Sequence, residues 1–350
     1  MMEIFIPGRL CLFGEHSDWA GGYRESDPSI LPGYCLITGT DQGIRADVSE
    51  NDGWFEVMSV LPGGSRIGPK RIPFAPEQLL KMARSTDFFR YAAGVAYEIS
   101  TRFNLSGIRI NVTSMNLPLK KGLSSSAAIC VLTARAFNII YDLHLTVEQE
   151  MEFAYLGELT AGSQCGRMDQ MCAYGKIPIF LTFDGNRTAM ERLSASRTFY
   201  FLVVDLKSTK NTQAILTSLN AAFNHSEPAI RDSVRSGLGK ENKRILFHAR
   251  EAIISGDGET LGALMTEAQT IFDRYLLPAC PRELSAPRLR SVLNHPHAKK
   301  LAFGGKGVGS QGDGCAQFVM PDPDARDSLS KVLEKELSVT CLPLTLPASQ

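Results

Sequence analysis

The stretch Pro118-Leu-Lys-Lys-Gly-Leu-Ser-Ser-Ser-Ala-Ala128 joins a basic, glycine-containing turn to a strongly helix-forming sequence. The first turn of a helix leaves about four backbone N–H groups unpaired and carries a partial positive charge. Gly122 lets the backbone approach a ligand closely. The serines at 124–126 supply hydroxyls for a helix cap, for phosphate or for Mg²⁺. The stretch therefore predicts either a phosphate-binding loop or an ordinary serine-capped helix.

The composition of the chain is that of a soluble globular protein. It has 350 residues, of which 44% are hydrophobic and 21% charged. Lys plus Arg and Asp plus Glu both number 37, so net charge gives no support for binding to nucleic acid or to a membrane surface. We find no secretory leader, no apolar stretch of the ~18 residues that span a bilayer and no CxxC pair. We expect a cytoplasmic, reduced protein without a zinc site.

Hydrophobic periodicity predicts an α+β chain with a change of domain in the polar stretch 184–197, which gives domains 1–195 and 196–350. In the first domain we expect strands at 3–13, 43–48, 54–60, 108–113, 171–174 and 177–183, and helices at 124–141 and 147–160. In the second we expect helices at 212–224, 229–255, 261–275, 287–295 and 323–336, and strands at 199–206, 317–320 and 338–343.

Near the N-terminus, the stretch Pro7–Gly22 places polar side chains directly after a predicted strand. Glu15, His16 and Asp18 follow the end of the strand at Gly14, and Arg9 lies on the strand itself. Carboxylates and an imidazole in this position suit the hydroxyls of a small polyol. A solvated polar turn is the alternative.

Two further segments carry groups that suit chemistry. Glu158 lies near a predicted helix end and Asp169 follows a glycine-bearing loop, so one carboxylate could bind a metal ion and the other accept a proton, unless both are structural. The stretch Gly304–Gly314 contains a GxGxxG pattern, but a strand and not a helix follows it, so we reject dinucleotide binding. A glycine-rich clamp or a plain turn remains.

Taken together, these segments resemble the GHMP kinase superfamily, and most closely its galactokinase-type sugar kinases. Pro7–Gly22 resembles the galactokinase signature, Pro118–Ala128 the phosphate-binding motif and, more loosely, Gly304–Gly314 the third motif. The resemblance implies the two-domain GHMP kinase fold, with an N-terminal domain like ribosomal protein S5 domain 2 and a ferredoxin-like C-terminal domain.

The resemblance also implies a role for each matching residue. Asp169 would accept the proton of the substrate hydroxyl, with Arg9 beside the transferred phosphoryl group. Ser126 and Glu158 would bind Mg²⁺, and Glu15, His16 and Asp18 would hold the sugar. ATP would contact Lys121, Gly122, Leu123, Ser124, Ser125, Ser126 and Ala127. The implied reaction moves the γ-phosphoryl group of ATP to a sugar hydroxyl, with the anomeric one as the expected acceptor, in a monomer or homodimer.

Several positions depart from the pattern of the family. Lys120 and Lys121 stand where galactokinases usually have small residues, and Ala20 replaces the commoner Asn. The segment Tyr23–Tyr34 is longer than usual. Lys306, Gln311 and Asp313 occupy positions where the family prefers Gly or Ala. These departures leave open which sugar is bound.

Two other functions fit the same resemblance. A mevalonate-kinase-like enzyme would act on a branched acid alcohol, but the polar Ser17 and Asp18 favour a polyhydroxylated substrate. A non-catalytic sugar or ATP sensor on the kinase fold would be expected to lack a catalytic residue, whereas Arg9, Ser126, Glu158 and Asp169 are all present.

Overall fold

The computed structural model describes residues 2–118, 121–163 and 165–349, and its contacts divide the chain into two compact units. The first unit contains residues 1–9 and 39–176, and the second contains residues 10–38 and 177–350. Strands β1 (Met2–Phe13) and β2 (Gly33–Glu50) each run from one unit into the other. Each unit is therefore built from two separate segments of the chain.

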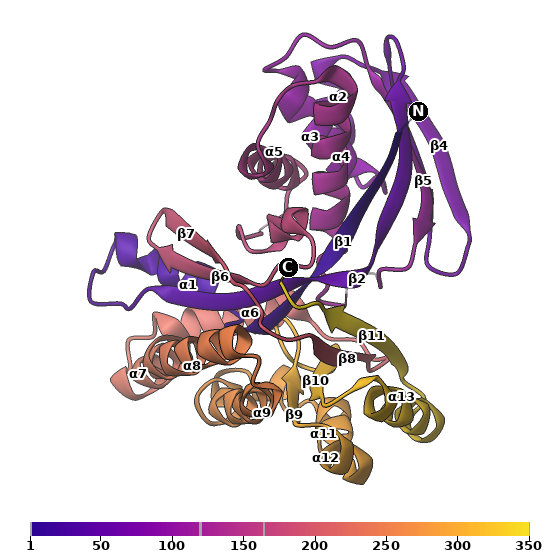
Figure 1. The fold of residues 1–350 in the computed structure, drawn as a ribbon. Helices are drawn as coiled ribbons and strands as arrows, with labels where there is room; N and C mark the ends of the chain where they lie inside the picture. The colour runs from indigo at the N-terminus through magenta and orange to yellow at the C-terminus, as the bar shows by residue number, and fades with distance from the viewer. Residues whose placement is uncertain (1, 119–120, 164, 350) are drawn as a thin grey trace. The chain divides into compact units, whose positions relative to one another are not determined.

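In the first unit, helices pack on one face of a β-sheet (Figure 1). Its strands β3 (Trp54–Val60), β4 (Arg66–Pro73) and β5 (Ile108–Met115) follow the order β4-β3-β5-β2. Strand β5 is parallel to β3 and antiparallel to residues 44–50 of β2. The helices are α2 (Pro76–Ala83), α3 (Arg90–Ser100), α4 (Ser125–Tyr141) and α5 (Val147–Thr160), with the 3-10 helix η2 (Asp169–Tyr174).

Helix α5 packs against α3 with little space between the two backbones. A Cβ atom at Gly157 would lie 2.6 Å from the backbone nitrogen of Val95, so only glycine permits this approach. The following residue, Glu158, is 1% exposed as a result of its position on this buried face. Close helix packing therefore places a carboxylate in the interior of the unit.

Helix α5 begins with a capping box. The side chain of Thr146 accepts a hydrogen bond from the backbone N–H of Gln149 (3.3 Å), and the Gln149 side chain accepts one from the backbone N–H of Thr146 (2.8 Å). Because loss of such a cap costs about 1 kcal/mol, we expect Thr146→Ala to lower the free energy of unfolding by about that amount in urea denaturation. Thr146→Ser, which retains the hydroxyl, should unfold close to wild type. Equal destabilisation by both variants would contradict the role of the cap.

The second unit contains an antiparallel sheet with the strand order β11-β8-β10-β9. These strands are β8 (Phe199–Asp205), β9 (Gly304–Gly307), β10 (Cys315–Met320) and β11 (Thr340–Leu346). Residues 33–37 of β2 pair with β6 (Ile179–Asp184), which pairs with β7 (Arg187–Arg192). A hydrophobic core that includes Leu202, Leu289 and Leu333 joins the four-stranded sheet to α11 (Pro287–Leu293), α12 (Pro296–Leu301) and α13 (Pro323–Leu337).

The second unit contains further helices, of which α9 (Gly258–Tyr275) packs against the edge strand β9. Near the N-terminus are α1 (Ser17–Gly22) and the 3-10 helix η1 (Tyr23–Glu25). Later in the chain are α6 (Thr212–Phe223), α7 (Pro228–Ser236), α8 (Asn242–Ser255), α9 (Gly258–Tyr275), the 3-10 helix η4 (Leu277–Ala279) and α10 (Pro281–Leu284).

Most elements that the sequence predicts are confirmed, including the helices at 124–141 and 147–160. The helix predicted at 229–255 is also present, although a π-helical turn, η3 (Gly237–Glu241), separates α7 from α8. The strand predicted at 171–174 is wrong, because these buried residues belong to η2. A short apolar run has no periodicity that distinguishes a strand from a buried helical turn. Helices α2 and α3 and strand β4 were not predicted.

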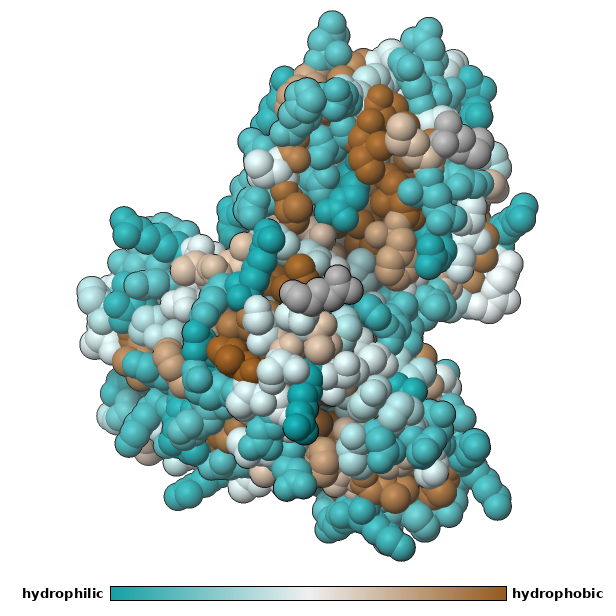
Figure 2. Space-filling model, viewed as in Figure 1, coloured by the Kyte–Doolittle hydropathy of each residue, from teal (hydrophilic) through white to brown (hydrophobic). Residues whose placement is uncertain are grey.

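The surface visible in Figure 2 is mostly hydrophilic. Among the residues that the structure describes, no helix is both long and apolar enough to cross a membrane.

Candidate functional site

Arg9 and Asp169 meet in the first unit. Arg9 lies on β1, and its Nη2 forms an ion pair with Oδ1 of Asp169, the first residue of η2. The Arg9 side chain is 7% exposed and that of Asp169 is 31% exposed. The backbone N–H of Arg9 donates to the carbonyl of Leu123 (3.1 Å), which ties β1 to the loop before α4. A solvent-accessible carboxylate is thus fixed beside a buried guanidinium.

Glu158 is a buried carboxylate near this ion pair. Its Oε2 accepts a hydrogen bond from Nε2 of Gln170 (2.5 Å). Burial, and next the negative charge of Asp169, raise the pKa of Glu158 from 4.5 to about 7, while hydrogen bonds from Ser126 and Gln170 partly oppose this rise. The two carboxylates, which the sequence places 11 residues apart, therefore share one electrostatic environment.

The loop before α4 presents the start of that helix without a side-chain cap. Ser124 occupies the N-cap position in the left-handed region, with φ of 58°, and its side chain makes no capping hydrogen bond. Its Oγ is buried and has no partner in the part of the chain that the structure describes. Gly122 also has a positive φ, of 83°, which favours glycine. The first-turn N–H groups of α4 therefore have no side-chain cap from Ser124, which is compatible with the anion site that the sequence predicts. Leu119 and Lys120 lie outside the described residues.

The donor set around Glu158 suits a divalent cation such as Mg²⁺. A hard cation prefers carboxylate and hydroxyl oxygens, and Glu158, Asp169 and Ser126 supply these groups. A raised carboxylate pKa beside a second carboxylate is the electrostatic situation that a bound cation relieves. The residues present thus fit the metal-ligand roles expected for Ser126 and Glu158.

A second group of predicted residues lies in the second unit. Glu15, which follows the end of β1, forms an ion pair with Nζ of Lys306 on β9, and the two side chains are 7% and 2% exposed. Lys306 Nζ also donates to the carbonyl of Gly307 (2.9 Å). The carboxylate expected to hold sugar hydroxyls is therefore already engaged through one of its oxygens by a lysine.

His16 is held as a neutral imidazole beside this ion pair. Its Nδ1 accepts a hydrogen bond from Nε1 of Trp19 (3.2 Å), which leaves the ring proton on Nε2. Burial, followed by the positive charges of Lys210 and Lys306, lowers the pKa of His16 from 6.5 to about 3. Lys210 donates to the carbonyl of Gln311 (2.9 Å), so the glycine-rich stretch after β9 positions this ammonium. We call the group Glu15, His16, Lys210, Lys306 and Gln311 the lysine corner.

Ser17 and Asp18, which follow His16, differ in burial. Asp18 is half-buried on α1, whereas Ser17 is fully buried and its hydroxyl accepts a hydrogen bond from Nδ2 of Asn242 (2.9 Å). Ser17 therefore serves packing, and of the two polar residues that favour a polyhydroxylated substrate only Asp18 remains suited to contact one.

The segment Tyr23–Tyr34 packs against helices of the second unit. The hydroxyl of Tyr23 donates to Oδ1 of Asn220 (2.7 Å), and its ring stacks on Phe223 with centroids 5.4 Å apart. Asp27 forms an ion pair with Arg235 (3.1 Å). These contacts anchor the segment to α6 and α7.

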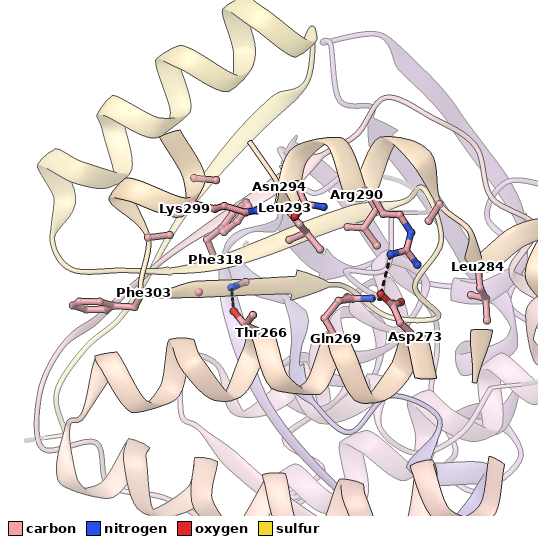
Figure 3. A pocket seen from close by; sticks show the side chains of 16 residues that line it. Thr266, Gln269, Asp273, Leu284, Arg290, Leu293, Asn294, Lys299, Phe303 and Phe318 are labelled. Carbon is pink, nitrogen blue, oxygen red and sulfur yellow. Dashed lines mark hydrogen bonds and ion pairs between the residues drawn. The ribbon is translucent and has the colours of Figure 1, made fainter. Parts of the chain in front are cut away.

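A separate pocket of about 370 Å³ lies in the second unit along β9, between α9 and α11 (Figure 3). Gln269 of α9 accepts a hydrogen bond from the backbone N–H of Gly307 (2.8 Å) and donates to Asp273 (3.0 Å), which also pairs with Arg290 (3.0 Å). The pocket contains none of the predicted site residues. Its side chains instead hold the strand that carries Lys306.

His295, His297 and Glu336 bring potential metal-binding atoms within 4.8 Å of one another. However, Nδ1 of His295 accepts a hydrogen bond from the backbone N–H of His297 (3.3 Å), so its Nε2 carries the proton that points to Glu336 (3.0 Å). With both ring nitrogens engaged in this way, His295 caps α12 and is not available as a metal ligand.

The structure thus places Arg9, Ser126, Glu158 and Asp169 in the first unit, and Glu15, His16 and Asp18 in the second. Sequence reasoning did not assign roles to Gln170, Lys210 or Lys306. The signal for Gln170 was its place directly after Asp169, and the signal for Lys306 was its departure from the small residue that the third motif prefers.

Comparison with known proteins identifies relatives over nearly the whole chain. Residues 90–176 match the family described as GHMP kinases N terminal domain. A galactokinase of Thermotoga neapolitana is 32% identical over 359 aligned positions, which cover 95% of this chain and 93% of the relative.

Solved structures share the fold at lower identity. The chain resembles Lactococcus lactis galactokinase complexed with galactose with a TM-score of 0.73 and 15% identity, over 99% of this chain and 93% of the other. It resembles L. major mevalonate kinase in complex with R-mevalonate with a TM-score of 0.73 and 18% identity, over 100% and 97%. The predicted α+β fold of these kinases is confirmed, and the fold by itself does not separate a sugar from a branched acid alcohol as substrate.

Proposed function

Because this chain belongs to the GHMP kinases, which are ATP-dependent small-molecule kinases, we propose that it phosphorylates a monosaccharide, with the anomeric C1 hydroxyl as the acceptor. The relative at 32% identity is a galactokinase, which supports a sugar over other small alcohols. The observation that carries the proposal is the grouping of Arg9, Asp169 and Glu158 in the first unit, where β1 is hydrogen-bonded to the loop that opens α4.

In this proposal, ATP phosphates bind at the start of α4, where first-turn N–H groups and the unpartnered hydroxyl of Ser124 face an anion. Lys121, Gly122, Leu123 and Ala127 complete the ATP-binding stretch. Ser126 and Glu158 hold Mg²⁺. When bound, this cation neutralises charge on the phosphate oxygens.

Asp169 accepts the proton of the sugar hydroxyl in the proposed reaction. Its Oδ1 is occupied by Arg9, whereas Oδ2 has no hydrogen bond from the residues described. One oxygen is therefore oriented while the other stays available for the proton. Arg9 offsets negative charge that develops on the transferred group. Glu15, His16 and Asp18 hold the sugar hydroxyls in this proposal.

The retained catalytic groups argue against a non-catalytic sensor. The half-buried Arg9–Asp169 ion pair and a Glu158 with a perturbed pKa are features of a site arranged for chemistry. A sensor would need neither of them.

We expect the purified protein to release ADP when it is given ATP, Mg²⁺ and one member of a panel of monosaccharides. ¹H and ³¹P NMR of the product should show phosphorylation at the anomeric carbon. The panel includes mevalonate, so the same assay tests both candidate substrates. Turnover of mevalonate alone would contradict the sugar assignment, and binding without turnover of any compound would favour the sensor.

A further inference from the structure

The lysine corner contains a buried ammonium with an unused donor. Lys306 is 2% exposed, and two of its three N–H bonds go to Glu15 and to the carbonyl of Gly307. The third has no partner among the residues that the structure describes. Burial of an ammonium is costly unless its charge is paired and its donors are satisfied. The unused donor therefore marks a place for an acceptor that the chain does not itself supply.

A second buried donor belongs to His16. Because Nδ1 accepts from Trp19, the proton lies on Nε2, which is buried. It makes no hydrogen bond of full geometry within the described chain, and the backbone of Ser310 near it opposes the fall in the pKa of His16. The neutral state is fixed by burial and by the two nearby lysines, which lower the pKa of His16 to about 3. The imidazole therefore acts in this corner as a donor from Nε2.

Buried acceptors without partners lie in the same region. Oε1 of Gln311 and Oε1 of Gln317 are both buried and unpartnered in the described part of the chain. Gln317 stands opposite Lys306 on β10, so both side chains lie on one face of the sheet. These oxygens suit hydroxyl donors. A ligand that fills the corner thus needs hydroxyls together with an acceptor group strong enough to engage an ammonium.

We propose that Lys306 is a specificity-determining residue whose ammonium, together with Nε2–H of His16, binds the carboxylate or phosphate of an acidic monosaccharide. This inference rests on the proposed function and names the substrate class of the same site. A neutral sugar would leave the buried ammonium with Glu15 as its single anionic partner. An acidic sugar adds a second anionic acceptor and presents its hydroxyls to the other oxygen of Glu15 and to the two glutamines.

The strand that carries Lys306 is held in place independently of the corner. Thr266 accepts a hydrogen bond from the backbone N–H of Gly305 (3.3 Å), as Figure 3 shows. Gln269 accepts one from the backbone N–H of Gly307. Replacement of the Lys306 side chain therefore leaves the hydrogen bonds that position β9. This makes the residue a suitable target for a test by substitution.

The test compares sugars that differ only at C6: D-galactose, D-galacturonate and D-galactose 6-phosphate, and the matching glucose series. Binding is measured by the fluorescence of Trp19, which contacts His16, in a Trp54→Phe background that removes the other tryptophan. We expect an acidic sugar to bind roughly 10- to 100-fold more tightly than its neutral counterpart. The carboxylate and phosphate arms distinguish the two sources of the anion.

Lys306→Met should remove this preference, so that an acidic sugar and its neutral counterpart bind with similar affinity. The matched control is Lys299→Met, which alters an exposed lysine of the same unit and should keep the preference. If Lys306→Met fails to fold because Glu15 is left buried and unpaired, Glu15→Gln combined with Lys306→Met removes both charges and should show the same loss of preference.

Tighter binding of the neutral sugars, or an acid preference that survives Lys306→Met, would overturn the inference. The two proposals fail separately. Acid-selective binding without phosphorylation of any sugar would sustain the lysine corner and refute the kinase assignment. Phosphorylation of neutral sugars alone would support the kinase assignment and refute the role of the lysine corner.

Discussion

Asp169→Asn is expected to lower kcat by roughly 10²- to 10⁴-fold while ATP still binds, since a positioned proton acceptor contributes a factor of this order. The amide keeps the size of the side chain but cannot take the hydroxyl proton. ATP would bind at the start of α4, where the hydrogen bond between Arg9 N–H and Leu123 does not involve the altered side chain. Rates come from ADP release and nucleotide affinity from calorimetry.

The matched control for this variant is Asp142→Asn. Asp142 lies in the same unit at the end of α4, and its side chain is 86% exposed. The control should retain wild-type turnover and nucleotide affinity. Near-normal turnover in Asp169→Asn would remove Asp169 from the mechanism, whereas loss of both turnover and nucleotide binding would assign it a structural role through its ion pair with Arg9.

Glu158→Gln should abolish Mg²⁺-dependent turnover and, in the absence of Mg²⁺, stabilise the protein at pH 8. Burial and the charge of Asp169 raise the folded-state pKa of Glu158 from 4.5 to about 7. The folded state then binds the proton more tightly than the unfolded state, so stability falls as the pH rises from 4.5 through 7. Above pH 7 the ionised Glu158 carboxylate lowers the free energy of unfolding by about 3 kcal/mol at most. The amide of Glu158→Gln carries no charge and removes this loss.

Thermal unfolding at pH 4.5 and pH 8, with and without Mg²⁺, tests this prediction. Wild type should gain stability from Mg²⁺ at pH 8 and lose that gain at acid pH, because protonated Glu158 no longer attracts a cation. Glu158→Gln should show neither the pH dependence nor the gain. Glu152→Gln, on the same helix with a side chain 43% exposed, is the control and should behave as wild type. A Mg²⁺ gain in Glu158→Gln equal to that of wild type would exclude Glu158 as a metal ligand.

The elements with long, regular patterns could be predicted from the sequence. Helix α5 is an example, because Thr146 and Gln149 form a cap within four consecutive residues and so mark where the helix begins. The segment 171–174 could not be predicted, because a run of four buried residues fits a strand and a 3-10 turn equally well. In the same way, the sequence shows serines before α4 but not that Ser124 adopts a positive φ and leaves its hydroxyl uncapped.

By itself the sequence determined the family and the residue types of the proposed chemistry, since both depend on short motifs whose members lie close together along the chain. Only the tertiary structure decided which charges meet. Glu158 acquires its raised pKa from burial and from Asp169, and Glu15 is paired with a lysine that lies 291 residues away. Burial and ion pairing arise from packing between distant segments, and no local pattern records them. For this reason the sequence could suggest a phosphate-binding loop from neighbouring residues, whereas the pairing of the lysine that we propose to select the sugar could not be read from it.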